Sequence, residues 1–425
     1  MPQTPTASRP AGHPPGLYVL FFTELWERYS FYSMMAILTL YMDERLHFST
    51  VRIGQIYGGY IGAVYFMPLI GGFLADRVFG FYRAVIIGGV LMALGHLSLA
   101  VERPVFFYSA LALLACGSGM LKPNVSTIVG NLYRDRPQLR DAGFNLFYMG
   151  INIGAFISPL TVSYFRAHYG WSVAFGSAAV AMGLSLVTFI GGHRLIRDAA
   201  RKVPAESEEA RTVTPAEARA RVSILLIIFA IVVAFWIAFY QNGFTLTFWA
   251  RDNTITSWPP ERFQSVEPLG VILFSPALVW IWSLLRRARA EPSTPMKMLI
   301  GMLFTAASFG IMVGAGLIGG DTGRVGVSWL VSSYLVIAVG EICLSPMGLS
   351  LVTKIAPPRM RGMLMGGWFV ATALGGYGSG VLGAYWYRVP HNRFFLLVVG
   401  VVALAAVALL GIMRPAKRVI AAAGA

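Results

Sequence analysis

The chain has 425 residues, of which 56% are hydrophobic and only 12% are charged, and its formal net charge at pH 7 is +15. Soluble domains carry about 25% charged residues, so this composition excludes an ordinary soluble domain and indicates an integral membrane protein. The positive charge alone would be compatible with binding to nucleic acid. Its distribution, described below, is explained by membrane topology, so we expect contact with membrane lipid and no nucleic-acid partner.

Apolar runs of about 20 residues, the length that crosses a bilayer, recur along the whole chain. They cover residues 15–42, 51–75, 81–101, 105–130, 141–166, 171–196, 222–250, 263–285, 296–319, 325–355, 360–386 and 394–413. The sequence thus predicts an all-α integral membrane fold of twelve transmembrane helices. The polar stretch 197–221 divides them into two six-helix bundles, 15–196 and 222–413.

The segments outside these runs predict the topology. Residues 1–14 are polar and rich in proline and carry no signal-peptide pattern, so we expect a disordered tail. When the 34 Lys and Arg residues are sorted by alternating sides, most fall on the side of the termini and of the stretch 197–221. The positive-inside rule then predicts that the termini, the linker 197–221 and the tail 414–425 are cytoplasmic, in a multi-pass protein of the cell membrane.

The first apolar run contains three charges, within the stretch FFTELWERYSFY at residues 21–32. Each charge costs about 2.5–3.5 kcal/mol at the middle of a membrane. Glu24, Arg28 and Tyr32 follow one another at four-residue spacing, with Glu27 beside them, so they share one side of a helix. This side must face water, another helix or a ligand.

The two halves resemble each other around their fourth helix. Gly117 precedes Pro123 in GSGMLKP, and Gly340 precedes Pro346 in GEICLSP, at the same interval. The match at equivalent places in a six-plus-six arrangement favours an internal duplication, which is common in transporters. The residue Lys122 in one half and Glu341 in the other are the ionisable groups that the duplication places in similar positions.

Few other strongly polar residues lie inside the apolar runs. Lys122 precedes a proline, which predicts a broken helix whose free backbone groups line a cavity or pack against protein. Lys122 and Glu341 could instead form a structural ion pair. Asn152 could serve only an interhelical hydrogen bond, and Glu267 could lie at the outer membrane interface.

Aromatic residues in membrane helices mostly pack or form interfacial belts. Trp236 and Trp368 lie well inside their helices and could instead wall a pocket. The sequence shows no phosphate-binding GxxxxGKS/T loop, nucleophile elbow or HExxH motif, and its histidines have no ligand spacing. We therefore expect no enzyme, no metal and no cofactor apart from protons as a coupling ion.

Several motifs together resemble those of the proton-dependent oligopeptide transporters, a family of the major facilitator superfamily. The segment ELWERYSFY is similar to that family's ExxERFxYY motif. The stretches GGFLADRVFGFYRAVIIGGVLMALG from Gly71 and FNLFYMGINIGAF from Phe144 are similar to its two signature patterns. GSGMLKPNVS and GEICLSPMGLS also match. The resemblance covers both halves and implies a major facilitator fold.

The resemblance further implies a peptide site between the two bundles that opens alternately to each side. By position, Arg28, Lys122 and Tyr32 would receive the peptide carboxylate, and Asn152 and Glu341 its amino terminus. Tyr65, Trp236 and Trp368 would line side-chain pockets, with Tyr240 close by. Glu24, Glu27 and Arg28 would take part in proton coupling.

The chain departs from the family pattern at three informative places. Tyr240 replaces a common glutamate, and Met35 replaces a common arginine, so the usual ion pair of the outer gate is absent. We therefore expect an apolar or aromatic outer gate. Glu267 replaces a common asparagine and could supply the missing acid for proton coupling.

The function implied is a proton-coupled symporter that imports di- and tripeptides as a monomer. Two alternatives stay open. One is proton-coupled transport of another small anionic or zwitterionic solute such as nitrate, and the other is a peptide sensor that transports nothing.

Overall fold

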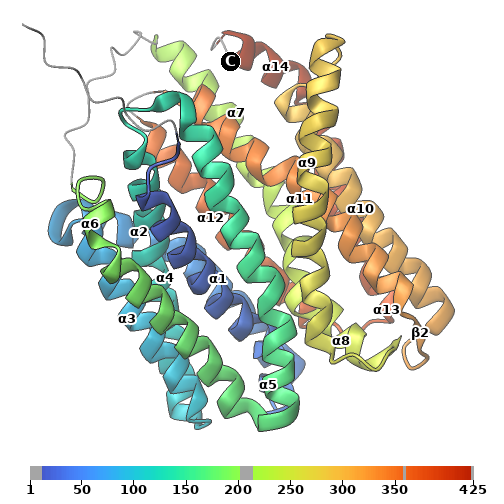
Figure 1. The fold of residues 1–425 in the computed structure, drawn as a ribbon. Coiled ribbons are helices and arrows are strands. Elements are labelled where there is room, and N and C mark those ends of the chain that lie inside the picture. Colours follow the sequence, from blue (N-terminus) through green and yellow to red (C-terminus); the bar gives the residue numbers. More distant parts are fainter. Residues whose placement is uncertain (1–11, 202–213, 358–359, 423–425) are drawn as a thin grey trace, which may run out of the picture.

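The structure is a computed structural model that describes residues 12–201, 214–357 and 360–422. The described part is almost entirely helical, as expected. The predictions for residues 1–11, for 202–213 in the linker and for 423–425 lie outside the described residues. Figure 1 shows the first half of the chain, blue to green, beside the second half, yellow-green to red.

The first half contains six helices and three short turns of other helix types. They are α1 (Gly16–Leu40), η1 (Tyr41–Arg45), α2 (Thr50–Leu74), η2 (Ala75–Phe79), α3 (Phe81–Ala100), α4 (Pro104–Leu132), η3 (Pro137–Leu139), α5 (Arg140–Gly191) and α6 (His193–Ile196). α5 consists of two helical arms, one on each side of Gly170, because this residue at φ 84° interrupts the helical backbone. Glycine tolerates this conformation since it has no Cβ, and Figure 1 shows the two arms folding back from this point.

The second half is similar in length and composition. It comprises α7 (Pro215–Phe239), η4 (Tyr240–Gly243), α8 (Thr245–Asp252), β1 (Thr254–Ile255), η5 (Pro260–Ser265), α9 (Val266–Arg287), α10 (Thr294–Gly319), β2 (Val325–Gly326), α11 (Val327–Ile355), α12 (Arg361–Gly383), α13 (His391–Gly411) and α14 (Met413–Ala422). The strands β1 and β2 form a short parallel pair that the sequence analysis did not predict.

The described chain contains twelve helices that can cross a membrane. Nine helical stretches are long and apolar enough to cross a membrane, and one of them, Pro137–Gly191, contains both arms of α5. α1 and α12 have 25 and 23 residues and are the remaining two. α1 is less apolar because of its three charges, which the next subsection places inside the protein.

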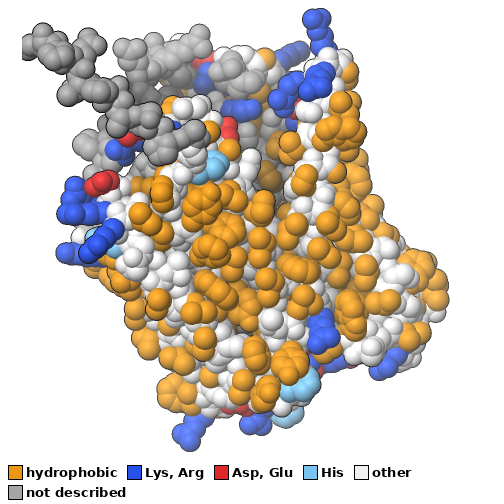
Figure 2. Space-filling model, viewed as in Figure 1, with side chains coloured by type: hydrophobic (Ala, Val, Ile, Leu, Met, Phe, Trp, Pro, Cys, Tyr) orange, Lys and Arg blue, Asp and Glu red, His pale blue; other side chains and the backbone are white. Residues whose placement is uncertain are grey.

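The hydrophobic surface matches a membrane setting. Figure 2 shows hydrophobic side chains over the middle of the molecule, with Lys and Arg gathered toward its ends. Side chains such as Val105 and Leu404 are 80% and 73% exposed. At one end, between α9 and α10, hydrogen bonds from Arg286 and Lys297 lower the pKa of Glu291 to about 2. Charges thus pair where the helices leave the apolar zone.

α2 and α12 join the two halves by a close approach of their backbones. A Cβ atom on Gly58 would lie 2.7 Å from the carbonyl oxygen of Tyr377, and Gly54 meets the backbone of Gly380 in the same way. Small residues allow membrane helices to approach closely. At Gly58 the backbone of α12 fills the space that a side chain would need.

Three boundaries differ from the sequence-based expectation. α7 begins at Pro215, before residue 222, because Thr214 caps it by accepting a hydrogen bond from the backbone of Glu217. The tail after residue 413 is helical as α14. The break expected at Pro123 is absent, since α4 runs through this proline from Pro104 to Leu132.

Candidate functional site

Three charged side chains of α1 form a buried cluster. Glu24, Glu27 and Arg28 keep only 1%, 0% and 2% of their surface exposed. Arg28 donates hydrogen bonds to both carboxylate oxygens of Glu27, and its Nε lies 3.5 Å from Oε1 of Glu24. Both arms of α5 cover α1, through Gly154 in one arm and the hydroxyl of Ser185 in the other. The charged side of the helix therefore faces protein.

A second cation balances this cluster. One guanidinium faces two carboxylates, so α1 alone has a surplus negative charge. Lys122 on α4 interacts electrostatically with Glu24. Tyr60 on α2, which is 5% exposed, interacts with both Arg28 and Glu27. The predicted charges of α1 and α4 thus lie in one cluster with two carboxylates and two cations.

Aromatic rings continue from Lys122 into the second half. The Lys122 ammonium lies 4.9 Å from the ring centre of Tyr65, a cation–π distance. The Tyr65 ring is 5.9 Å from that of Tyr240, which stacks on Trp236 at 5.7 Å. The structure therefore brings four predicted site residues, on α2, α4, α7 and η4, into one wall.

The predicted groups of α9 and α11 form a second polar cluster. Glu267 on α9 interacts electrostatically with Glu341 on α11. Tyr32 and Tyr148 interact electrostatically with both carboxyl groups, and Tyr32 also interacts with Arg28. Asn152 donates a hydrogen bond to the carbonyl oxygen of Tyr148 at 3.0 Å. Tyr32 therefore lies between the two clusters.

These contacts decide three of the alternatives that the sequence left open. Glu267 is 9% exposed and faces Glu341, so it does not lie at a lipid interface. No ion pair within 4.0 Å joins Lys122 to Glu341 in the described parts of the chain. The hydrogen bond of Asn152 is made within α5 and not between helices.

Trp368 lies apart from the aromatic wall. It is 2% exposed, its ring lies 6.2 Å from that of Phe229, and it packs over Gly348. In this structure it fills space between α7, α11 and α12. Its part in a side-chain pocket stays a prediction.

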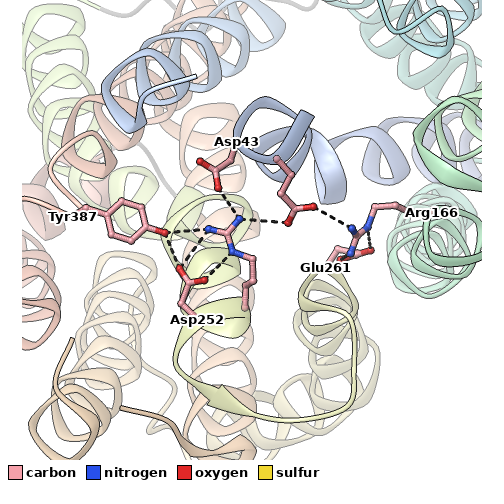
Figure 3. Close-up of polar contacts among 7 residues, drawn as sticks. Asp43, Arg166, Asp252, Glu261 and Tyr387 are labelled. Carbon is pink, nitrogen blue, oxygen red and sulfur yellow. Dashed lines mark hydrogen bonds and ion pairs between the residues drawn. The ribbon is translucent and has the colours of Figure 1, made fainter. Parts of the chain in front are cut away.

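A network of charges joins the two halves at the end of the molecule where α8 lies, opposite α14 (Figure 1). We call it the distal end, and Figure 3 shows its contacts. Arg251 at the end of α8 donates hydrogen bonds to Asp43 of η1 at 2.7 Å and to Asp252 at 2.8 Å. The hydroxyl of Tyr387 donates to Asp252 at 2.7 Å. Arg251 thereby holds the first half against the second.

The second arginine of the network belongs to the first half and binds an acid of the second half. Arg166 on α5 donates hydrogen bonds to both oxygens of Glu261 in η5, at 2.6 and 3.0 Å. Glu44 lies 3.4 Å from both Arg166 and Arg251, so it links the two arginines. Each half contributes one arginine and two acids, and the charges alternate along the seam.

Uncharged contacts lie beneath this network. The Tyr57 hydroxyl donates to the carbonyl oxygen of Tyr240, and the Thr39 hydroxyl to that of Gly243. The Tyr57 ring packs 5.5 Å from the ring of Phe244. Within the described residues, every hydrogen bond between the halves belongs to this layer, to the charged network or to its neighbours in η5.

The expectation of an apolar or aromatic closure was therefore incomplete. The aromatic layer is present, but a charged layer covers it. Arg166 and Arg251 were not predicted as site residues, because their partners are far away in the sequence. Met35 and Tyr240 carry no charge, and the ion pairs between the halves are instead those of Arg251 with Asp43 and Arg166 with Glu261.

Two residues of the site were not predicted from the sequence. Tyr148 lies four residues before Asn152, on the same face of α5, and this spacing could have revealed it. Tyr148 keeps 39% of its surface exposed although it interacts with Glu267 and Glu341. Tyr60 has no comparable signal, because α2 carries several tyrosines and only packing shows which one faces Arg28.

Comparison with known proteins agrees with this geometry. The model of the POT family matches residues 82–214 and 199–395. The chain belongs to the POT family. It is 33% identical to "Peptide transporter YePEPT" of Yersinia enterocolitica over 88% of either chain, and 30% identical to the "Di-/tripeptide transporter" of Lactococcus lactis over 85% of this chain and 87% of that one.

Solved structures of this family have the same fold. A peptide transporter POT crystallised with sulfate has a TM-score of 0.88 at 33% identity, with 96% of each chain covered. A POT family transporter in complex with 5-aminolevulinic acid has a TM-score of 0.86 at 28% identity, covering 96% of this chain and 97% of that one. The chain is therefore a multi-pass membrane transporter with an all-α major facilitator fold, as predicted.

The burial of Arg28 predicts a large effect of removing it. An Arg28→Met variant leaves Glu24 and Glu27 without their adjacent cation, and breaking a buried ion pair costs about 3–5 kcal/mol. We expect a lower unfolding temperature in detergent at pH 7, with part of the loss regained at lower pH, where protonation removes the unpaired charge.

The control Arg45→Met removes a 56% exposed arginine that pairs with Glu102 and should cost at most about 1 kcal/mol. Equal unfolding temperatures for the two variants would contradict the buried pairing.

The distal network predicts that Arg251 stabilises closure of this end. Spin labels at Val105 and Thr322, in a background without Cys116 and Cys343, would report the separation of the two halves there. Arg251→Gln removes hydrogen bonds to charged groups worth about 1.5–3 kcal/mol and should shift the distance distribution to longer values.

The matched control for this measurement is Arg388→Gln. Arg388 is exposed and near Tyr387 but donates no hydrogen bond to the network in the described structure. It should leave the distances unchanged. An Arg251→Gln distribution that equals the wild-type one would show that the network does not hold the distal end closed.

Proposed function

We propose that this protein is a proton-coupled symporter that imports di- and tripeptides by alternating access. The observation that carries the proposal is that the interior cations and a second pair of acids lie in different halves of the protein. Two cations, Arg28 and Lys122, lie in the first half, and the carboxyl pair Glu267 and Glu341 lies in the second. A zwitterionic peptide needs a cation for its carboxylate and an anion for its amino terminus.

The size of the substrate is consistent with this arrangement. Tyr32 interacts with Arg28 of one cluster and with both acids of the other, so the clusters are neighbours, and extended residues of about 3.3–3.6 Å each would let a short peptide contact both. Its carboxylate would bind Arg28 and Lys122 with Tyr32 beside them, and its amino terminus would bind Glu341 near Asn152. Contacts to the two ends are independent of side-chain identity, so varied peptides would be accepted.

The side chains of the peptide would meet an apolar surface. Tyr65, Tyr240 and Trp236 form the aromatic wall described above, and we assign them to this surface. Trp368 would join it only if α12 moves. Aromatic walls with few polar groups suit ligands of mixed polarity.

Proton coupling would centre on α1. While the peptide is absent, Arg28 is occupied by Glu27 and lies close to Glu24. A peptide carboxylate that draws Arg28 away leaves these acids buried without their partner, and a proton then neutralises them. Glu267 is the further acid on the path. No cofactor beyond protons enters this scheme.

The closed distal end belongs to one state of the alternating cycle. The positive-inside rule puts the termini in the cytoplasm, so the distal end would face outward. The described structure would then be closed to the outside by the distal network. The peptide would leave at the opposite end, toward the cytoplasm. We expect a monomer in the cell membrane, with no enzymatic activity.

Transport in proteoliposomes tests the proposal. With an imposed inward proton gradient, the purified protein should accumulate a labelled dipeptide above its equilibrium level, and a protonophore should abolish the accumulation. A dipeptide with an amidated carboxyl end should be taken up poorly, since it offers no anion to Arg28 and Lys122. Uptake of nitrate or another small anion without peptide uptake would support the anion alternative. Saturable binding without uptake would support the sensor alternative.

A Glu27 variant tests the coupling. Glu27→Gln keeps hydrogen-bonding groups beside Arg28 but cannot be an ionised partner. We expect peptide exchange across the membrane to continue while accumulation driven by the proton gradient is lost. The surface variant Glu291→Gln should retain both activities. Wild-type accumulation by Glu27→Gln would overturn the role of Glu27 in coupling.

A further inference from the structure

A cavity lies between α4 and α5, near the end of the molecule opposite the distal end. Its volume is about 350 Å³, within the range of roughly 300–1,000 Å³ that is typical of small-molecule sites. Its walls come from residues 126–134 and 140–144, and no acid lines it in the described structure. We call it the α4–α5 cavity. The peptide site proposed above uses none of its residues.

Two arginines of the α4–α5 cavity have no acidic partner. Arg134 and Arg140 are exposed, and among the described residues no ion pair within 4.0 Å involves either of them. The guanidinium of Arg140 lies 5.9 Å from the ring centre of Phe144, a cation–π distance that orients it. A Cβ atom on Gly130 would lie 3.5 Å from Nη2 of Arg140. Both cations are therefore available to an anion in the cavity.

The wall that α4 contributes offers hydrogen-bond acceptors. The hydroxyls of Ser126 and Thr127 donate to backbone carbonyl oxygens one turn earlier, at 3.2 and 2.9 Å. The side-chain amide of Asn131 donates to the carbonyl oxygen of Ala199 at 2.8 Å. Because their donors are used, the oxygen atoms of these side chains remain as acceptors. Cations together with uncharged acceptors suit a ligand that carries a carboxylate and N–H groups.

The α4–α5 cavity continues the proposed peptide site along both helices. On α4, Ser126 lies one turn after Lys122, and on α5, Phe144 lies one turn before Tyr148, so neighbouring residues share a side of each helix. Gly130 lies about 12 Å beyond Lys122 at 1.5 Å per residue. An extended tripeptide spans roughly 10 Å. A peptide can therefore move from Lys122 into the cavity in a shift of about its own length.

The corresponding end of the second half is also basic. α11 has Lys354 in its last turn, and α12 begins with Arg361 and has no acid in its first turn. These helices correspond to α4 and α5 in the internal duplication. At the distal end, by contrast, acids of each half bind the arginines of the other. The end with the α4–α5 cavity therefore offers cations for which an anionic ligand meets little competition.

We propose that Arg134 and Arg140 form a second anion subsite, which receives the carboxylate of the peptide after it has left Arg28 and Lys122 and before it leaves the protein. The inference rests on the proposed function, because it requires a peptide that departs through this end. The amino end would follow along α4, where Ser126 and Thr127 can accept its hydrogen bonds.

The strength of the subsite suits release. An arginine binds a carboxylate with two parallel hydrogen bonds, so the carboxylate exchanges the cations of the interior for those of the cavity. Pairs between exposed charges are weak, at about 0–1 kcal/mol. The peptide is therefore held long enough to leave the interior but not long enough to block the cavity. No bond forms or breaks in this step.

Membrane vesicles of opposite orientation test the subsite. Inside-out vesicles from cells that produce the protein expose the α4–α5 cavity to added peptide, and right-side-out vesicles expose the distal end. Arg134→Gln and Arg140→Gln should each raise the half-saturating dipeptide concentration for exchange about fivefold in inside-out vesicles, as for one lost exposed ion pair. Right-side-out vesicles should keep the wild-type value. An increase in right-side-out vesicles, or no increase in either kind, would overturn the proposal.

Arg136→Gln is the matched control. Arg136 belongs to the same connection between α4 and α5, but it donates a hydrogen bond to the carbonyl oxygen of Gly12 at 2.8 Å and does not line the cavity. The substitution removes the same charge from the same end and should leave both half-saturating concentrations unchanged. Equal effects of Arg136→Gln and Arg140→Gln would show that the general charge of this end acts on the peptide, and the subsite would be refuted.

Filling the cavity supplies a variant that does not change charge. Gly130→Leu places a bulky side chain in the α4–α5 cavity, and leucine is favoured over glycine in a helix, so the fold should be kept. We expect a higher half-saturating concentration in inside-out vesicles. Gly310→Leu on α10 adds the same side chain where no atom lies within 4 Å of a Cβ, and it should behave as wild type. Wild-type values for Gly130→Leu would contradict entry of peptide into the cavity.

The phosphate group of an anionic lipid offers the same chemistry as the peptide carboxylate. The purified protein is therefore compared in vesicles of phosphatidylcholine alone and in vesicles that also contain phosphatidylglycerol. The ratio between the half-saturating concentrations of Arg140→Gln and wild type should be the same in both. An effect confined to the anionic lipid would assign the arginines to lipid and overturn the proposal.

The outcomes separate this inference from the proposed function. If wild type exchanges no peptide in either kind of membrane vesicle, the proposed function fails. If wild type exchanges peptide and the cavity variants keep its half-saturating concentrations, the subsite alone is refuted.

Discussion

Arg28 and Glu27 face each other in a helix where neither water nor lipid can compensate their charges, and this interaction constrains the helices around it. Removing one partner of such a pair costs about 3–5 kcal/mol, because the other charge is left buried. The pair is tolerable only because both arms of α5 and Tyr60 of α2 enclose it and Lys122 of α4 adds a second cation. The packing of α2, α4 and α5 around α1 therefore keeps these buried charges paired.

The three polar regions of the molecule differ in how their charges are satisfied. In the cluster on α1, acids and cations balance. At the distal end Arg166 and Arg251 alternate with acids across the seam between the halves, which makes a contact that can be broken and remade. Glu267 and Glu341 interact with tyrosine hydroxyls, and no ion pair within 4.0 Å joins them to a cation in the described structure. A transporter needs a stable interior, a seam between its halves that can open and close, and a polar subsite for its substrate.

The sequence predicted most of the site because charged residues in apolar runs are few. Glu24, Glu27, Arg28, Lys122 and Glu341 were all identified in this way, and the structure places each of them in a polar cluster. The helices were predicted almost as well, since a run of apolar residues of sufficient length has few other solutions. The predictions that failed concern helix boundaries and the contact between the two halves. The charged layer over the aromatic residues at the distal end is an example.

The sequence by itself determined the class of protein, the number of membrane helices and the inventory of interior charges, because these depend only on residue type and on the local cost of placing a residue in lipid. Only the tertiary structure decided the pairings: Arg166 with Glu261, Arg251 with Asp43, and Glu267 with a second acid. Whether two such side chains meet depends on how helices far apart in the chain pack, and no local pattern encodes that distance.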